Sequence, residues 1–208
     1  MNKLFVVYFI SFWIVNLACS QNTDTPDRVV GGACDNCKLM FEGMPASFSW
    51  ETKIAPLDEP GEPILIRGTI YQNDGKTPAS GVILYVYHTD HSGIYSPGAA
   101  QTAAKRHGHL RGWMKSDGQG RYQFRSIRPA AYPERNAPQH IHATIKEPQA
   151  TPYWIDEYQF DDDPLLTTKE KAKAQQHGGP GIIHLTKNEK SEWVGQRNII
   201  LGLNIPNY

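Results

Sequence analysis

The chain has 208 residues, of which 39% are hydrophobic and 11% aromatic, and its 21 basic residues balance 21 acidic ones. This length suits one globular domain with a core of its own, and the composition excludes an intrinsically disordered chain. A formal net charge of zero argues against a nucleic-acid-binding protein, which carries a clustered positive excess, and against a polybasic protein that binds an anionic membrane surface.

The first twenty residues have the pattern of an export signal. A basic start at Lys3 precedes a run over 4–15 that is apolar apart from Ser11. This run is too short to span a bilayer, which takes about 20 apolar residues, but it fits the apolar region of a secretory signal. From Gln21 the chain becomes polar. We therefore predict a signal peptide over 1–20 and an exported protein, either in the periplasm or cell envelope or secreted.

The end of this signal leaves two processing routes open. The segment Leu17-Ala18-Cys19 resembles the end of a bacterial lipobox, although Asn16 stands where that motif normally has leucine. Lipidation of Cys19 would anchor the protein to a membrane without spanning it. The alternative is ordinary cleavage after Ala18 or Ser20.

Residues 21–45 are predicted to form a linker that contains a CxxC motif, Cys34 to Cys37. A haem attachment site would need histidine next, where the chain has Lys38. A zinc site would need two more ligands at motif spacing, and none follow. A redox-active pair would normally open a helix after a strand. In an oxidising compartment the remaining interpretation, a small structural disulfide between Cys34 and Cys37, is favoured.

Strand patterns dominate the predicted domain over 46–208. The run over 82–88 is a nearly continuous series of β-branched and aromatic residues, typical of a strand buried on both faces. The segment 121–126 alternates, with Tyr122 and Phe124 on one face. Strands are predicted over 64–71, 82–88, 121–126, 140–145, 153–160 and 198–205.

One helix is indicated over 169–176. Thr167 and Glu170 form a capping box before it, and Gly178-Gly179-Pro180 ends it. The triple aspartate 161–163 is expected to be a solvated turn that ends the preceding strand, not a calcium site. Together these elements predict a mostly β protein, an antiparallel β-sandwich with long loops and one short helix.

His140 and His142 are the first candidate metal ligands. They lie two apart in a predicted strand, so their side chains share one face of it and both imidazoles can reach a single ion. Taken alone, the pair also fits two histidines on a polar strand face.

The motifs before this pair occur in a specific order. They are Gly93-x-Tyr95, Arg111-Gly112, Ser116-Asp117, Gly120-x-Tyr122-x-Phe124, Ile127-x-Pro129, Tyr132-Pro133 and finally His140-x-His142. This set resembles the intradiol ring-cleavage dioxygenases, the protocatechuate and catechol type of non-haem iron(III) enzyme. The pattern is most similar to a short, exported bacterial branch of that family.

The resemblance implies that Tyr95, Tyr132, His140 and His142 bind Fe(III), and that Tyr132 acts as the base for a substrate proton. Ferric iron favours anionic oxygen donors, and its charge drives deprotonation of a bound phenol. The implied partners are a small catecholic substrate and O2, with ring cleavage to a cis,cis-muconate-type diacid and no external reductant. The oligomeric state stays open, with a homodimer as the default.

One position departs from the family. The well-studied enzymes carry an arginine three residues before the first histidine, where it stabilises negative charge developing on the substrate, and this chain has Ala137 there. Losing such a preorganised cation typically costs about 10²–10³ in rate. Arg135 or Arg111 is a candidate substitute, and either also fits a surface or ion-pairing residue.

Two other protein classes match parts of the sequence. His140-x-His142 with Glu147 and His184 partly matches a cupin iron(II) site, but the glycines of that motif are absent. The strand and turn pattern also resembles transthyretin-like or carboxypeptidase-regulatory-like domains, which are non-catalytic binding modules of cell-surface proteins. Such modules have no reason to carry both tyrosines and the histidine pair.

Overall fold

The structure is a computed structural model that describes residues 26–34, 36–97 and 106–208. The predicted signal peptide over 1–20 and the lipidation candidate Cys19 lie outside the described residues. Among the helices of the described part, none is both long enough and apolar enough to cross a membrane.

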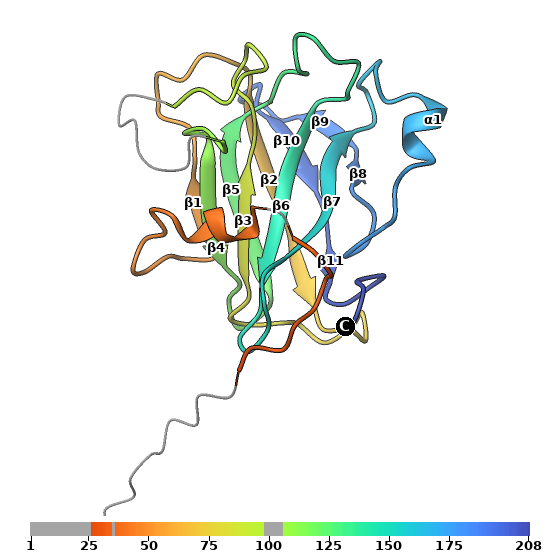
Figure 1. Cartoon of the computed structure of the whole chain (residues 1–208). Coiled ribbons are helices and arrows are strands. Elements are labelled where there is room, and N and C mark those ends of the chain that lie inside the picture. The colour runs from red at the N-terminus through yellow and green to blue at the C-terminus, as the bar shows by residue number, and fades with distance from the viewer. Residues whose placement is uncertain (1–25, 35, 98–105) are drawn as a thin grey trace, which may run out of the picture.

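Two β-sheets form the body of the molecule (Figure 1). The first has the spatial order β1 (Glu51–Lys53), β5 (Arg121–Ile127), β2 (Pro63–Tyr71), β10 (Trp193–Gln196) and β9 (Leu185–Lys187), and β11 (Ile199–Ile200) also pairs with β2. The second has the order β4 (Arg111–Lys115), β3 (Ile83–Tyr87), β6 (His140–Lys146), β7 (Tyr153–Phe160) and β8 (Ile182–Ile183). The mostly β architecture is confirmed. The sheets are mixed, however, because β1, β10 and β11 join the first in parallel and β8 joins the second in parallel.

The core lies between the sheets and explains the sequence patterns. Leu84, Tyr85 and Val86 of β3 are all fully buried, as expected of its continuous apolar run, and Tyr122 and Phe124 bury one face of β5. The strand predicted over 153–160 has those bounds in the structure. The core therefore fixes β3, β6 and β7 as central strands, and these strands position the site described below.

Two predicted elements are shorter than expected. Only Ile199–Ile200 of the last predicted strand pairs with β2, because positive φ angles at Gly202 (73°) and Asn204 (58°) turn the chain. The helix α1 (Thr168–Lys171) begins as predicted, with the Thr167 hydroxyl accepting from the Glu170 backbone N–H, but it has four residues. None of them is buried, so no packing stabilises a longer helix.

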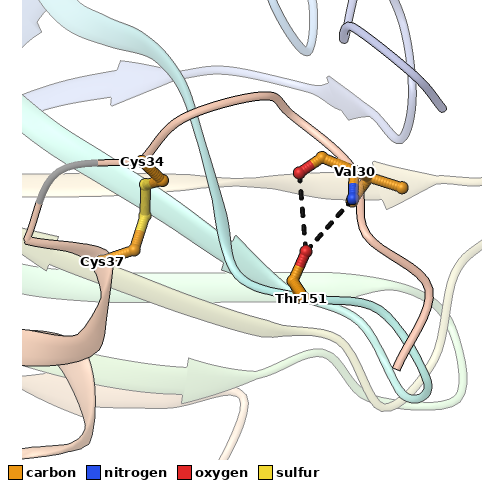
Figure 2. The surroundings of a disulfide bond; sticks show 4 residues. All are labelled: Val30, Cys34, Cys37 and Thr151. Carbon is orange, nitrogen blue, oxygen red and sulfur yellow. Dashed lines mark hydrogen bonds between the residues drawn. A yellow bond between two sulfur atoms is a disulfide. The ribbon is translucent and has the colours of Figure 1, made fainter. Parts of the chain in front are cut away.

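The segment expected to be a linker packs against the sandwich from Val30 onward. The side chain of Val30 is 1% exposed, and its backbone N–H donates to the Thr151 hydroxyl at 3.1 Å (Figure 2). Cys34 and Cys37 form a disulfide, and the 3-10 helix η1 (Cys37–Phe41) follows it. Met40 of η1 is fully buried. Isolated apolar residues thus attach this polar segment to the domain.

Candidate metal centre

Two phenol oxygens and two imidazole nitrogens converge beside β6. Tyr95 follows β3, Tyr132 follows β5, and His140 and His142 lie at the start of β6. The Tyr95 hydroxyl lies 2.6 Å from the Tyr132 hydroxyl and 2.8 Å from His142 Nε2. The Tyr132 hydroxyl lies 3.1 Å from His140 Nε2 and 3.5 Å from His142 Nε2. Donor atoms that bind one ion at roughly 2 Å lie about 3 Å from each other, so this spacing fits a shared metal.

The remaining imidazole nitrogens are both tied. His140 Nδ1 lies 2.7 Å from the Pro138 carbonyl oxygen, and His142 Nδ1 lies 2.8 Å from Glu157 Oε1. The Pro138 carbonyl oxygen and an ionised Glu157 carboxylate carry no hydrogen. In each pair, therefore, Nδ1 carries the proton and donates it. Each Nε2 therefore presents its lone pair to the phenol oxygens, which is the tautomer that a metal ligand needs.

Burial favours the neutral form of Tyr95, Tyr132 and His140 in the metal-free protein. It raises the pKa of Tyr95 above its ordinary value of about 10, and the hydrogen bond with Tyr132 raises it further. Burial likewise raises the pKa of Tyr132 and lowers the pKa of His140. A polyvalent cation would reverse the effect on the phenols, since its charge favours the phenolate. The donor set thus fits a hard, highly charged ion.

Gly93 lets the two tyrosine-bearing loops meet. Its φ is +78°, and a Cβ built there would lie 2.1 Å from the Ala131 carbonyl oxygen. Only glycine combines that φ with such close backbone contact at low cost. The Thr89 hydroxyl also donates to the Ala130 carbonyl at 2.7 Å. The loop that carries Tyr95 is therefore bound directly to the loop that carries Tyr132.

Asp90 organises the first of these loops from within. Its carboxylate accepts the backbone N–H groups of Ser92 at 2.8 Å and Ile94 at 3.1 Å, and it also accepts from the Ser96 hydroxyl. Burial alone would raise the pKa of Asp90, but these hydrogen bonds lower it below its ordinary value. The carboxylate thus stays ionised and holds the turn that precedes Tyr95.

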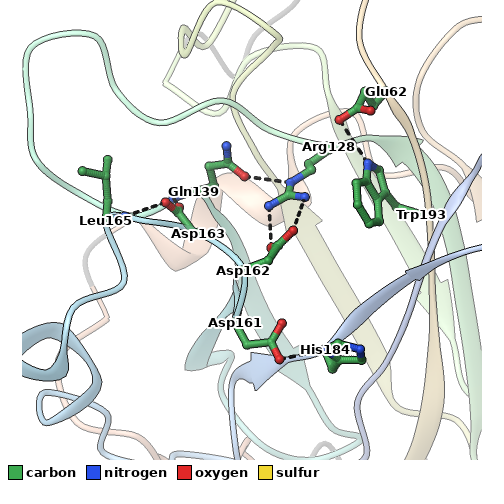
Figure 3. A network of polar contacts seen from close by, with 9 residues as sticks. All are labelled: Glu62, Arg128, Gln139, Asp161, Asp162, Asp163, Leu165, His184 and Trp193. Carbon is green, nitrogen blue, oxygen red and sulfur yellow. Dashed lines mark hydrogen bonds and ion pairs between the residues drawn. The ribbon is translucent and has the colours of Figure 1, made fainter.

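Arg128 stabilises the start of β6 through an ion pair and a hydrogen bond (Figure 3). Its guanidinium binds both carboxylate oxygens of Asp162, at 2.8 and 2.7 Å, and donates to Gln139 Oε1 at 2.8 Å. The backbone N–H of Gln139 donates to Asp163 at 2.5 Å. The aspartates form the turn predicted at the end of β7, with Asp161 and Asp162 exposed and Asp163 buried, and through Arg128 and Gln139 this turn also holds the residue next to His140.

Glu157 is the residue that sequence reasoning missed. On β6, Ile141 pairs with Tyr158 and Ala143 pairs with Ile155, so Asp156 and Glu157 both lie opposite the single residue His142. This β-bulge directs Glu157 at the imidazole. A signal was present, because the buried positions of β7 change phase between Ile155 and Tyr158. His140, His142 and Glu157 form one group in which each residue offers a ligand atom within 4.8 Å of the others.

The candidate cations lie at different depths. Arg135 is exposed, and its guanidinium carbon lies 5.7 Å from the centre of the Tyr132 ring. Arg111 lies on β4, two strands from His142 in the same sheet, with its guanidinium carbon 5.4 Å from the Trp113 ring. Of the two, Arg135 is the one placed beside a candidate ligand.

The residues of the cupin-type alternative do not come together. Glu147 accepts hydrogen bonds from the hydroxyls of Tyr153 and Tyr208, and His184 pairs with Asp161 at the surface. Neither contacts His140 or His142 among the described hydrogen bonds and ion pairs.

A small cleft opens beside His142. Its walls include Tyr87 and His107, whose rings stack at 3.6 Å between centroids, and the disulfide segment at Cys34 and Cys37. Burial lowers the pKa of His107 to about 4, so it is neutral near pH 7. The cleft has a volume of about 260 Å³ and reaches Glu157.

Comparison with known proteins settles the family. The family model described as Dioxygenase, that of the intradiol ring-cleavage enzymes, matches residues 47–191. The chain belongs to the intradiol ring-cleavage dioxygenase family. Members of this family are iron-dependent, and the donor set described above fits that metal.

Two curated relatives are similar to parts of the chain. Catechol 1,2-dioxygenase 1 of Acinetobacter lwoffii is 29% identical over 125 residues, which is 52% of this chain and 39% of the relative. Chlorocatechol 1,2-dioxygenase of Pseudomonas sp. strain P51 is 35% identical over 75 residues, which is 36% of this chain and 28% of the relative. The matched part of each relative is therefore well under half of its length.

Solved structures share the fold at low sequence identity. The dioxygenase domain of a carbohydrate-binding fusion protein from Streptomyces sp. SirexAA-E has a TM-score of 0.58 at 20% identity, over 77% of this chain and 96% of that one. Hydroxyquinol 1,2-dioxygenase from Pseudomonas putida DLL-E4 has a TM-score of 0.56 at 21% identity, over 87% of this chain and 68% of that one. These likenesses establish the sandwich fold of the family.

Proposed function

We propose that this protein is a non-haem Fe(III) intradiol dioxygenase that cleaves a catecholic ring with O2 to a cis,cis-muconate-type diacid. The observation that carries the proposal is the convergence of Tyr95, Tyr132, His140 and His142, with both histidines held in the tautomer that offers Nε2. Bound Fe(III) would supply the Lewis acidity that binds a catecholate and makes it reactive toward O2.

Tyr132 is the residue we assign to proton transfer. Its oxygen lies within 3.5 Å of donor atoms from all three other ligands, so it has the most crowded position in the set. The nearby guanidinium of Arg135 favours the phenolate form, which can accept a catechol proton at Oη when the substrate arrives. Tyr95, tied to His142, would remain the permanent oxygen ligand.

Arg135 is also the cation that we assign to the substrate. Ala137 brings no charge to the position where the family has arginine, and Arg135 lies beside Tyr132 on the same loop. An exposed guanidinium is screened by water and stabilises charge less than a buried one. The expected consequence is slower turnover than in family members that carry an arginine at the position of Ala137.

The cellular setting is part of the proposal. The signal pattern over 1–20 supports an exported enzyme, in the periplasm or anchored to the envelope through Cys19, and otherwise secreted. The disulfide between Cys34 and Cys37 suits such an oxidising compartment. The substrate would therefore be a small catechol met outside the cytoplasm.

The test uses the purified mature protein. We expect near-stoichiometric ferric iron, a visible tyrosinate-to-iron absorption band, and O2 uptake with simple catechols. Tyr132→Phe should remove or shift that band and reduce O2 uptake by at least about 100-fold, whereas Tyr71→Phe on β2 should leave both unchanged. Colourless protein that binds no ferric iron would contradict the proposal and favour the non-catalytic binding module.

A further inference from the structure

The two candidate histidine ligands differ in what holds their second nitrogen. His140 Nδ1 donates to a neutral acceptor, the Pro138 carbonyl, at 2.7 Å. His142 Nδ1 donates to the Glu157 carboxylate at 2.8 Å. The two rings lie on one strand with centroids 4.7 Å apart, so the contrast is between partners rather than locations.

The Glu157 carboxylate is held in place by the bulge in β7. The backbone carbonyl of Asp156 accepts a hydrogen bond from Arg197 at 2.6 Å, and the Arg197 side chain is buried. The Asp156 carboxylate accepts the Gln176 backbone N–H at 2.7 Å. The extra residue of the bulge is thus fixed from both sides, which keeps its neighbour Glu157 directed at His142.

Glu157 offers His142 a carboxylate, the ordinary form of a glutamate at neutral pH, and this carboxylate accepts the Nδ1–H at 2.8 Å. An anionic acceptor polarises the imidazole N–H more strongly than a carbonyl does, which makes Nε2 a stronger electron donor. The carboxylate also adds a negative charge close to the ion.

The geometry argues against Glu157 as a ligand of the same ion. Its carboxylate meets His142 at Nδ1, whereas the tyrosine oxygens meet the imidazole at Nε2, on the other side of the ring. An ion bound by the tyrosines and His142 Nε2 therefore lies away from the carboxylate. Glu157 acts on the metal through the imidazole.

We propose that Glu157 is a charged positioning residue of the iron site, which fixes His142 Nε2 toward the tyrosine oxygens and strengthens it as a ligand of ferric iron. This inference rests on the proposed function, because it concerns the same ion. It assigns the two histidines unequal roles, with His142 the stronger donor.

The experiment compares Glu157→Gln with Glu147→Gln in the full mature protein. Glutamine at 157 keeps an acceptor oxygen for His142 and removes the charge. Glu147 is a matched control, since its carboxylate also accepts hydrogen bonds, from Tyr153 and Tyr208, at a place outside the site. We expect E157Q to weaken ferric-iron affinity by about 10- to 100-fold and to shift the tyrosinate absorption band, with E147Q matching the wild type in both.

A cavity variant adds a second readout. Glu157 is 35% exposed and lines the 260 Å³ cleft, so formate can reach the space left by Glu157→Ala. We expect E157A to bind iron more weakly than E157Q, and formate, but not chloride at equal ionic strength, to restore at least part of the affinity and the band position. The unfolding transition of each metal-free variant checks that it is folded.

The outcomes separate the two proposals. Wild-type protein that binds ferric iron, together with an E157Q variant whose affinity and band are unchanged, would overturn the role of Glu157 and leave the proposed function intact. Wild-type protein that binds no ferric iron would overturn both. Iron bound without any tyrosinate band, and lost in E157Q, would make Glu157 a ligand and overturn its positioning role.

Discussion

The histidine pair and the tyrosine pair of the site are held by different interactions, strand pairing for the first and loop contacts for the second. His140 and His142 belong to β6, a central strand that pairs with β3 on one side and β7 on the other. Tyr95 and Tyr132 lie on loops outside any strand, and the loops are held by contacts with each other and by side-chain hydrogen bonds. The strand gains its rigidity from the whole sheet, whereas the loops depend on a few residues.

This difference predicts how each half of the site fails. A strand residue can be perturbed only by loosening its neighbours, so single substitutions should have moderate effects there. The loops rely on individual backbone contacts, such as that of Gly93 with Ala131, which have no substitute. The tyrosine half should therefore be the more fragile of the two.

Replacing Gly93 by alanine should have the largest effect. A β-carbon there meets the Ala131 carbonyl oxygen at 2.1 Å in a backbone conformation that alanine disfavours. We expect a loss of at least about 3 kcal/mol in the free energy of unfolding, and loss of the tyrosinate band because Tyr95 and Tyr132 move apart. Urea titration and the visible spectrum of iron-loaded protein measure both.

Gly118→Ala is the matched control for this clash. A β-carbon at Gly118 meets nothing within 4 Å, and its φ lies outside the left-handed region. The control should lose less than about 1 kcal/mol and keep its colour. Equal behaviour of the two variants would show that the contact between the loops does not hold the tyrosines.

Acid should weaken the base of the Tyr95 loop by no more than the Gly93 substitution does. His88, where β3 ends, is fully buried, with Nδ1 donating to the Thr89 carbonyl and Nε2 accepting from the Ser126 hydroxyl, both at 2.7 Å. Burial lowers its pKa to about 4. Between pH 6.5 and 4 the unfolded chain binds a proton that the folded chain excludes, so stability is full above pH 6.5 and falls toward pH 4, by about 3 kcal/mol.

A His88→Gln variant tests this assignment. It should be less stable than the wild type at pH 7, yet lose less stability between pH 6.5 and 4, because one proton uptake by the unfolded chain has been removed. The lowered pKa of His107 acts in the same direction and leaves part of the slope in place. Urea titrations at several pH values give the free energy of unfolding of each protein as a function of pH. If wild type and His88→Gln lose stability equally between pH 6.5 and 4, His88 does not cause the loss.

The same contrast explains what the sequence could predict. The spacing of His140 and His142 follows from the period of a strand, so physical reasoning alone places both imidazoles on one face. Tyr95 and Tyr132 lie in loops without any period, and only the resemblance to a family pointed to them. Glu157 was missed because a bulge breaks the register that connects strand neighbours.

The fold shows the same limit. The long strands were predicted because several buried residues repeat in each, as in β5 and β7. Strands such as β1 and β9 have three residues each, which is too few for an alternation to be recognised. The attachment of the N-terminal segment rests on single side chains such as Val30 and Met40, which carry no pattern at all.

Loosening the histidine strand should have a smaller effect than either Gly93→Ala or acid. Arg128→Met keeps an apolar chain beside the rings of Phe160 and Trp193 but removes the paired bonds to Asp162 and the bond to Gln139. We expect a loss of about 1–3 kcal/mol in the free energy of unfolding and a several-fold weaker iron affinity, with the tyrosinate band retained. Arg125→Met is the control, because its pair with Glu192 is half exposed and worth at most about 1 kcal/mol.

Whether Arg128→Met keeps the tyrosinate absorption band tests whether sheet pairing stabilises the histidines. Because Gln139 precedes His140 directly, losing one of its two anchors, the bond from Arg128, should loosen the strand end while β3 and β7 still hold His142. The iron would then bind more weakly but keep both tyrosines. If Arg128→Met instead abolished the band as Gly93→Ala is expected to, the strand half would be as fragile as the loop half, and sheet pairing would not be what stabilises the histidines.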